Sequence, residues 1–140
     1  MRYFKLEELV CPHIFAKYGG FAWNFLDPRL LTLLDNIRSG IGKPVTVNNY
    51  RDGLDERGLR CTKCEIVRKE IEAGNLYMSA HTLGKAVDFD VEGLTAEETR
   101  LILTAKKNLW PYGFRLERDV TWVHLDMFNP GIEKIVFFNP

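Results

Sequence analysis

The sequence predicts an α+β fold, a small and largely antiparallel sheet with helices packed on one side. Three observations predict it. Segments with helix start and stop signals recur along the chain, shorter segments alternate apolar and polar residues, and the C-terminal third is rich in such alternating segments. The chain of 140 residues is 46% hydrophobic and shows no repeat or linker, so we expect one domain over residues 1–140.

The first expected helix lies within residues 26–42. Asp27 is a favourable N-cap, and Pro28 suits the first helical position that follows it. The helix then places its large apolar residues on one stripe: Leu30, Leu33, Leu34 and Ile37. Glycines end it. The next segment, PVTVNNY, predicts a short strand with two valines on one face, Val45 and Val47.

Two further helices are expected after a polar loop, rich in glycine, over residues 52–60. The first covers residues 62–74 and ends at a glycine. The second begins with a capping box between Thr95 and Glu98. We expect it to turn three apolar side chains inward: Leu101, Ile102 and Ala105. The remainder is β-rich with two turns, near residues 118–119 and 129–131.

Two segments alternate apolar and polar residues, so each predicts a strand with two different faces. In residues 85–91 the apolar face carries Val87, Phe89 and Val91, and in residues 121–127 it carries Val123, Leu125 and Met127. If both apolar faces meet the helices, four polar side chains project from the opposite face of the sheet: Asp88, Asp90, His124 and Asp126. Such a face needs water, a metal ion or a substrate beside it.

His81 lies just upstream of the first of these strands, in a turn flanked by glycine, from which it can lean over the same face. Two imidazoles and one carboxylate are a typical set of ligands at catalytic zinc sites, where a fourth position is left for water. Zinc lowers the pKa of that water to about 7 and polarises a neighbouring carbonyl group, which suits amide hydrolysis. The alternative from the residues alone is an ordinary solvated strand face with two surface histidines.

The charge balance and hydropathy exclude several classes of partner. Nineteen basic residues balance nineteen acidic ones, so no net field favours nucleic acid or an anionic membrane. No apolar run approaches the roughly 20 residues of a membrane span, so we expect no membrane insertion. Residues 1–13 contain acidic side chains where a signal peptide needs an apolar stretch, which predicts a cytoplasmic product in the producing cell. We also expect a monomer.

The three cysteines do not resemble a secreted disulfide framework, because their number is odd and two of them form a CxxC pair. The segments CPH and CTKC contain four residues that zinc accepts as ligands: Cys11, His13, Cys61 and Cys64. The alternative is a set of reduced thiols in loops. The sequence leaves both open.

The stretch SAHTLGKAVDFD, residues 79–90, resembles the SxHxxGxAxD signature of the zinc D-alanyl-D-alanine carboxypeptidase/dipeptidase family. That family includes phage endolysin peptidases that cut L-alanyl-D-glutamate bonds, and it shares its fold with hedgehog signalling domains and lysostaphin-type enzymes. WVHLD resembles the family's second zinc-histidine strand, and NNYRDG resembles its (S)GYR segment. LEELVCP followed by DPRLLTLLDNIR is similar to the opening of its phage-type branch. The resemblance covers essentially the whole chain and implies a hedgehog/DD-peptidase-like fold.

The resemblance also implies roles for individual residues. The zinc ligands would be His81, Asp88 and His124. Arg51 would pair with a substrate carboxylate or the developing oxyanion, since a guanidinium offers a forked set of donors. Ser79 would hydrogen-bond near the substrate or simply stabilise the turn. Gly84 would allow a close approach between His81 and the strand that follows. Asp126 would orient His124.

One departure from the family concerns the base that activates water. Active members carry Glu or Asp three residues before the second histidine, and here that position is Thr121, which cannot accept a proton at neutral pH. Asp119, at the turn that enters the strand, is the preferred substitute, and Glu117 is the second choice. A chain without an efficient base would bind zinc and hydrolyse weakly or not at all.

The expected function is therefore a zinc peptidase that cuts peptidoglycan stem peptides next to a D-amino acid. A phage or prophage product without a signal peptide would be kept in the cytoplasm until lysis, or carried in the virion. The rival expectation is a non-hydrolytic zinc-binding module that recognises cell-wall peptide or another protein, which Thr121 favours. A third is a structural phage protein whose metal only stabilises the fold.

Overall fold

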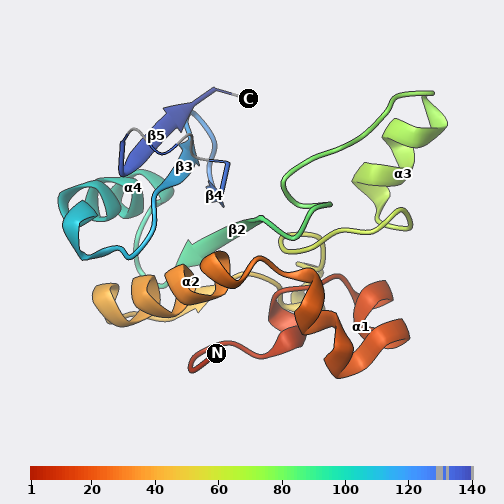
Figure 1. Cartoon of the computed structure of the whole chain (residues 1–140), viewed down its shortest axis with the longest axis horizontal. Helices are drawn as coiled ribbons and strands as arrows, with labels where there is room; N and C mark the ends of the chain where they lie inside the picture. The colour runs from red at the N-terminus through yellow and green to blue at the C-terminus, as the bar shows by residue number, and fades with distance from the viewer. Residues whose placement is uncertain (129–130, 132, 140) are drawn as a thin grey trace.

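The computed structural model describes residues 1–128, 131 and 133–139. Within them lie four α-helices and a five-stranded sheet (Figure 1). The helices are α1 (Pro12–Tyr18), α2 (Pro28–Ile41), α3 (Glu65–Glu72) and α4 (Ala96–Ala105). The strands are β1 (Val45–Thr46), β2 (Ala86–Val91), β3 (Phe114–Glu117), β4 (Val123–Asp126) and β5 (Ile135–Phe138).

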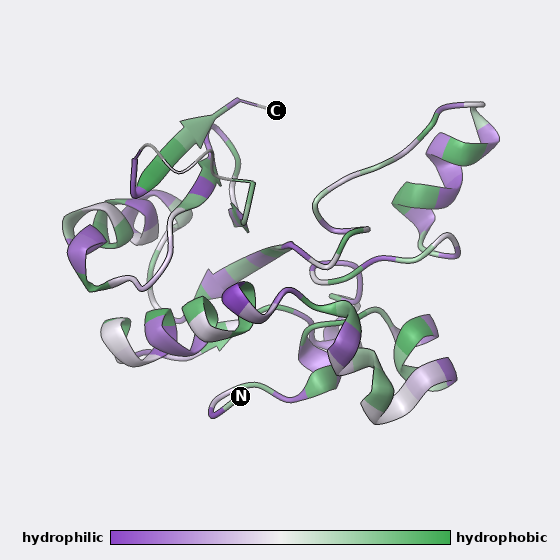
Figure 2. Cartoon of the chain, viewed as in Figure 1, coloured by the Kyte–Doolittle hydropathy of each residue, from purple (hydrophilic) through white to green (hydrophobic). Residues whose placement is uncertain are grey.

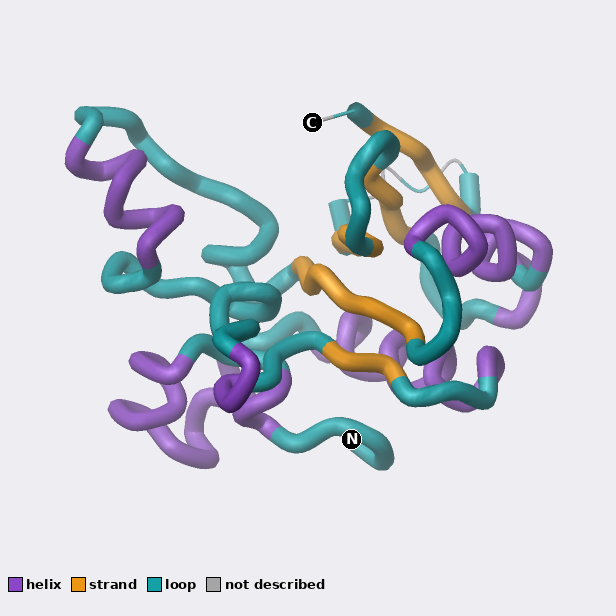
Figure 3. The backbone as a smooth tube through the Cα atoms, turned by 180° about the vertical axis from the view of Figure 1, so that it is seen from behind, coloured by secondary structure: helices purple, strands orange, loops and turns teal. Residues whose placement is uncertain are grey.

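The strands form one sheet in the order β1-β2-β4-β3-β5. They are the orange segments of Figure 3. All neighbouring pairs are antiparallel except β3 and β5, which are parallel. β2 and β4 pair so that Asp88 faces His124 and Ala86 faces Asp126 across the two strands. The predicted α+β class with a mostly antiparallel sheet is confirmed.

One hydrophobic core joins α2 to the apolar face of the sheet. The predicted stripe of α2 is fully buried, and so are the apolar residues of the two alternating strands, among them Phe89 and Leu125. Figure 2 shows hydrophilic residues interspersed with the hydrophobic ones along α2, as an amphipathic helix requires. Because the apolar side chains of β2 and β4 face this core, their polar side chains face the other way.

The predicted helix caps are present. The Asp27 side chain accepts a hydrogen bond of 2.9 Å from the Arg29 backbone N–H, and Pro28 occupies the first turn of α2. At α4, the Glu98 backbone N–H donates to Thr95 Oγ1 at 3.1 Å, and the Thr95 backbone N–H donates to Glu98 Oε2 at 2.7 Å. These caps satisfy backbone donors that the first helical turn leaves unpaired.

The face that α4 turns inward differs from the prediction. Leu101 is 62% exposed and Ala105 is also exposed, whereas the buried residues of the helix are Thr99, Arg100 and Leu103. The run Leu101, Ile102, Leu103 is apolar throughout, so its periodicity left the inward face undecided. The rotation of the helix places Arg100 against the loop between β3 and β4.

Arg100 ties that loop to α4. Its Nε donates to the Glu117 carbonyl at 2.9 Å, and its Nη2 donates to the Val120 and Trp122 carbonyls at 2.7 and 2.8 Å. We expect Arg100→Ala to lower the free energy of unfolding by about 3 kcal/mol, because it leaves three carbonyls without this donor. Urea denaturation measures the loss. The exposed Arg68→Ala is the control, expected within about 0.5 kcal/mol of wild type, and equal effects of the two would contradict this role.

The loop between β3 and β4 contains the predicted turn near residues 118–119, where Asp119 has a positive φ of 58°. The other predicted turn, near residues 129–131, lies largely outside the described residues, since 129 and 130 are not among them. The predicted helix over residues 62–74 is α3, which begins after the N-cap Cys64.

Candidate metal centre

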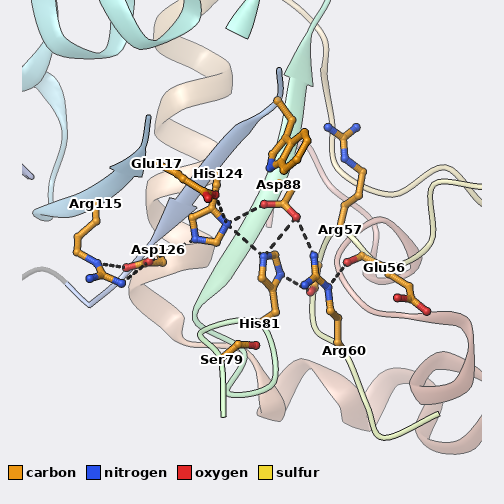
Figure 4. Close-up of polar contacts among 12 residues, drawn as sticks. Glu56, Arg57, Arg60, Ser79, His81, Asp88, Arg115, Glu117, His124 and Asp126 are labelled. Atoms are coloured by element: carbon orange, nitrogen blue, oxygen red, sulfur yellow. Dashed lines mark hydrogen bonds and ion pairs between the residues drawn. The ribbon is translucent and has the colours of Figure 1, made fainter. Parts of the chain in front are cut away.

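The three expected zinc ligands meet on the polar face of the sheet (Figure 4). Asp88 and His124 are cross-strand partners in β2 and β4, and His81 lies in the turn over residues 80–84 that precedes β2. His124 Nδ1 lies 2.8 Å from Asp88 Oδ1. His81 Nε2 lies 3.2 Å from His124 Nδ1 and 3.3 Å from Asp88 Oδ2. One ligand atom from each residue therefore faces a common point, and this group can hold a metal ion.

In each histidine, the ring nitrogen that does not face Asp88 is hydrogen-bonded to an oxygen acceptor. His81 Nδ1 lies 2.9 Å from the Gly58 carbonyl oxygen, and His124 Nε2 lies 3.3 Å from Asp126 Oδ2. A carbonyl and an ionised carboxylate only accept, so both of these nitrogens carry hydrogen. Binding of a metal ion would require both rings to be neutral, and His81 Nε2 and His124 Nδ1 would then offer it their lone pairs beside Asp88. Partners of this kind orient metal-binding histidines in proteins.

The electrostatics of the cluster keep Asp88 ionised and His124 protonated at neutral pH. Burial acts to lower the pKa of His124, but its hydrogen bonds to Asp126 and Asp88 outweigh it and raise the pKa to about 9. Burial likewise acts to raise the pKa of Asp88, yet hydrogen bonds to His124 and His81 hold it well below its usual range. The negative charge of Asp88 therefore persists at neutral pH, beside two imidazoles, in a largely buried place.

The turn that carries His81 rests on backbone contacts with the N-terminal half of the chain. The Gly84 carbonyl accepts a hydrogen bond of 2.9 Å from the Asp27 N–H, and Gly84 itself has a φ of +67°. Ser79 lies at the start of this turn, where its Oγ accepts from the Thr82 N–H at 3.3 Å and its N–H donates to Thr82 Oγ1 at 3.0 Å. These contacts place Ser79 in the turn and at the edge of the adjacent hollow.

Two adjoining hollows open beside the cluster. The first, of about 430 Å³, is lined by the three expected ligands together with Glu117 and the aromatic Tyr77, Phe128 and Phe138. The second, of about 600 Å³, extends toward Asp90 and Thr121. They share four lining residues: Arg60, Ile66, Asp88 and Trp122. A substrate lying across both would pass directly over the carboxylate of Asp88.

Asp126 lies where the sequence analysis placed it, beside His124. It also forms a two-pronged ion pair with Arg115, with distances of 2.9 and 2.8 Å, and accepts from the Phe128 N–H at 2.8 Å. Burial acts to raise the pKa of Asp126, but hydrogen bonds to His124 and Arg115 lower it to about 2. Asp126 therefore stays ionised and keeps hydrogen on His124 Nε2.

The structure does not bring Arg51 or Asp119 to the cluster. Arg51 is exposed and lines a separate hollow with Glu7 and Tyr50. Asp119 is exposed in the loop after β3 and lines another hollow, beside Thr121. Both positions differ from the sequence-based expectation because the two loops carry these side chains into hollows that contain none of the three expected ligands.

Two other residues, Arg60 and Glu117, lie beside the cluster. Arg60 Nη2 donates to Asp88 Oδ2 at 2.8 Å, and its Nε donates to the Glu56 carbonyl. Glu117 Oε2 lies 3.9 Å from His124 Nδ1, with only 13% of its side chain exposed. Glu117 was the second choice from the sequence. Arg60 was not predicted, because no local pattern distinguishes it from Arg57 in the same polar loop.

Among the residues that the structure describes, no helix is long and apolar enough to cross a membrane. Comparisons of the chain with protein-family models, with curated proteins and with solved structures found no match.

Proposed function

We propose that the protein is a zinc-dependent peptidase that hydrolyses peptidoglycan stem peptides next to a D-amino acid. The observation that carries the proposal is the convergence of His81 Nε2, His124 Nδ1 and the Asp88 carboxylate within 2.8–3.3 Å of one another, beside an open hollow. The substrate class comes from the resemblance of SAHTLGKAVDFD to the signature of the zinc carboxypeptidase family.

The donor set suits zinc, and the resemblance to a zinc peptidase family selects this metal from those that accept two histidines and a carboxylate. Two imidazole nitrogens and one carboxylate, with hydrogen-bonded partners behind the imidazoles, are the ligands that catalytic zinc sites use. Zinc bound there would supply a Lewis acid and a water of lowered pKa. The hollow on the open side of the three ligands leaves room for both water and a peptide carbonyl group.

Glu117 is the residue that we propose as general base. Its carboxylate lines the same hollow as the three ligands, and its Oε2 is 3.9 Å from His124 Nδ1. It can take a proton from the attacking water and return it to the leaving amine. Arg100 fixes this region by holding the Glu117 carbonyl. We propose Glu117 rather than Asp119 as the base, because Asp119 lines a different hollow.

Arg60 has two proposed tasks. By donating to Asp88 Oδ2 it fixes the orientation of that carboxylate and leaves Oδ1 on the side of His124. Its guanidinium also adds positive charge to the wall that the two hollows share, where a substrate carboxylate would bind. The aromatic side chains that line the first hollow offer apolar contact for a peptide.

The proposed setting is a phage or prophage product that acts on the cell wall after lysis or from the virion. This setting rests on the family resemblance. We propose that the protein works as a monomer and needs neither nucleic acid nor membrane insertion.

Substitution of Glu117 tests the proposed chemistry. With zinc-loaded protein and purified peptidoglycan, we expect wild type to release free amino groups. Glu117→Gln should lower the rate by about 10²- to 10⁴-fold, because the base is lost while the shape of the side chain is kept. Asp119→Asn is the control and should stay within about twofold of wild type. Amine release by labelling and bound zinc by elemental analysis are measured on the same samples.

The outcomes separate two functions. Equal rates for Glu117→Gln and wild type would contradict the role of Glu117. Absence of amine release by zinc-bound wild type would favour the second candidate, a non-hydrolytic module that binds cell-wall peptide. The observation that favours this candidate is Thr121, which stands where active members of the family carry an acid. Calorimetric titration with muropeptide would then measure binding without turnover.

A further inference from the structure

A second group of possible metal ligands lies outside the proposed catalytic centre. It contains Cys11 and His13, at the start of α1, and Cys61 and Cys64, in the segment before α3. One ligand atom from each residue lies within 4.8 Å of the others. The two pairs are about 50 residues apart in the sequence, so their meeting depends on the fold rather than on local chain geometry.

Backbone hydrogen bonds bring the two segments together. Val10 and Leu59 form a parallel bridge, in which the Cys11 N–H donates to the Leu59 carbonyl and the Leu59 N–H donates to the Leu9 carbonyl, both at 2.9 Å. Gly58 lies in this contact, since a Cβ there would come within 2.1 Å of the Leu9 carbonyl oxygen. The approach of Cys11 to Cys61 is therefore built into the backbone.

The sulfur separation fits a shared zinc ion. Cys11 Sγ lies 3.7 Å from Cys61 Sγ, and none of the three thiols is in a disulfide. Two sulfurs at about 2.3 Å from a tetrahedral zinc ion are about 3.8 Å apart, whereas bonded sulfurs in a disulfide are about 2.05 Å apart. The observed distance excludes a disulfide and allows both sulfurs to bind one zinc ion, and it is equally the distance of two thiols in direct contact.

Backbone donors in the CxxC segment are directed at the sulfurs of both of its cysteines. The Cys61 N–H points to Cys64 Sγ at 3.3 Å, and the Lys63 N–H points to Cys61 Sγ at 3.4 Å. Backbone donors directed at sulfur stabilise the deprotonated form that binds metal. Cys11 and Cys64 are fully buried, while Cys61 is half-buried and His13 is exposed, so an ion could enter from the side of His13.

We propose that Cys11, His13, Cys61 and Cys64 form a second, structural zinc site with four protein ligands. The alternative is a set of packed, reduced thiols without a metal ion. That alternative gives no reason for the imidazole of His13 to lie beside the three sulfurs. A closed set of three thiolates and one imidazole is a common structural zinc site. It differs from the first centre, whose three ligands leave an open position.

Zinc at this second site would also stabilise the first centre, which consists of His81, Asp88 and His124. The segment that it clamps to α1 contains Gly58, whose carbonyl holds His81, and Arg60, whose guanidinium holds Asp88. Zinc at the cysteines would therefore limit the motion of both partners. Zinc binding at the cysteines does not depend on peptidase activity.

Metal analysis of three variants tests the proposal. After zinc loading and desalting, wild type should retain two equivalents of zinc. His81→Ala should retain one, Cys61→Ser should retain one, and the double variant should retain none. Cobalt in place of zinc in His81→Ala should give the intense near-ultraviolet absorption of cobalt–thiolate bonds. This readout requires no substitution of a cysteine, so it stands even if Cys61→Ser fails to fold.

Thiol reactivity completes the test. In zinc-loaded His81→Ala, the three thiols should react slowly with a disulfide reagent and quickly after a chelator is added. Equal reactivity with and without zinc, together with no cobalt–thiolate absorption, would overturn the second site. That result would leave the peptidase proposal intact, because amine release by wild type is measured separately.

Discussion

Asp88→Asn is expected to remove zinc from the first centre while leaving the cysteine site loaded. Asn keeps the shape of the side chain but lacks the negative charge that would hold a zinc ion between His81 and His124. Since loss of a partner behind a ligand alone costs about 10- to 100-fold in metal affinity, we expect the loss of this ligand to exceed about 100-fold. Competition with a chromophoric chelator measures the affinity.

Asp90→Asn is the matched control, because Asp90 lies two residues along the same strand and on the same face. It pairs with Arg57 at 2.6 Å and is exposed, outside the ligand group. We expect it to bind zinc as wild type does. Circular dichroism must show that both variants are folded. If folded Asp88→Asn kept the zinc affinity of wild type, the assignment of the first centre would be wrong.

Gly84→Ala is expected to destabilise the protein severely. A Cβ at this position would lie 1.9 Å from the Phe25 carbonyl oxygen and 3.2 Å from the Leu26 Cα, and neither backbone atom can move cheaply. The residue also has a φ of +67°, which costs an L-residue about 1–2 kcal/mol by itself. Together these effects should lower the free energy of unfolding by more than about 3 kcal/mol.

Gly53→Ala separates the two causes. Gly53 has a similar φ of +71°, but a Cβ there would meet no atom within 4 Å. The free energy of unfolding of Gly53→Ala should therefore fall only by the conformational cost of the positive φ, about 1–2 kcal/mol. Urea denaturation of both variants gives the comparison. If Gly84→Ala were no less stable than Gly53→Ala, the close packing of the His81 turn on residues 25–26 would be refuted.

Local sequence patterns predicted much of the scaffold. The cap at Asp27 and the leucine stripe after it placed α2, because capping and a 3.6-residue period are properties of one segment. Alternation in residues 85–91 and 121–127 separated the apolar from the polar face of β2 and β4. The same patterns failed at α4, where three adjacent apolar residues made every rotation of the helix equally plausible.

The site was predicted in part. His81, Asp88, His124 and Asp126 were named from the family signature and from alternation along the strands. Arg60 and Glu117 acquire their places only from the packing of a loop and the pairing of β3 with β4. Loop residues have no period, so nothing in the chain around Arg60 indicated that it would reach Asp88.

By itself, the sequence determined which side chains share a face, where helices start, and which residues are able to bind a metal ion. Only the tertiary structure decided which of them meet. The register that sets Asp88 opposite His124, the bridge that brings Cys11 to Cys61, and the loop that turns Asp119 away are contacts between distant segments. Such contacts depend on how the whole core packs, because each segment alone is compatible with several partners and registers.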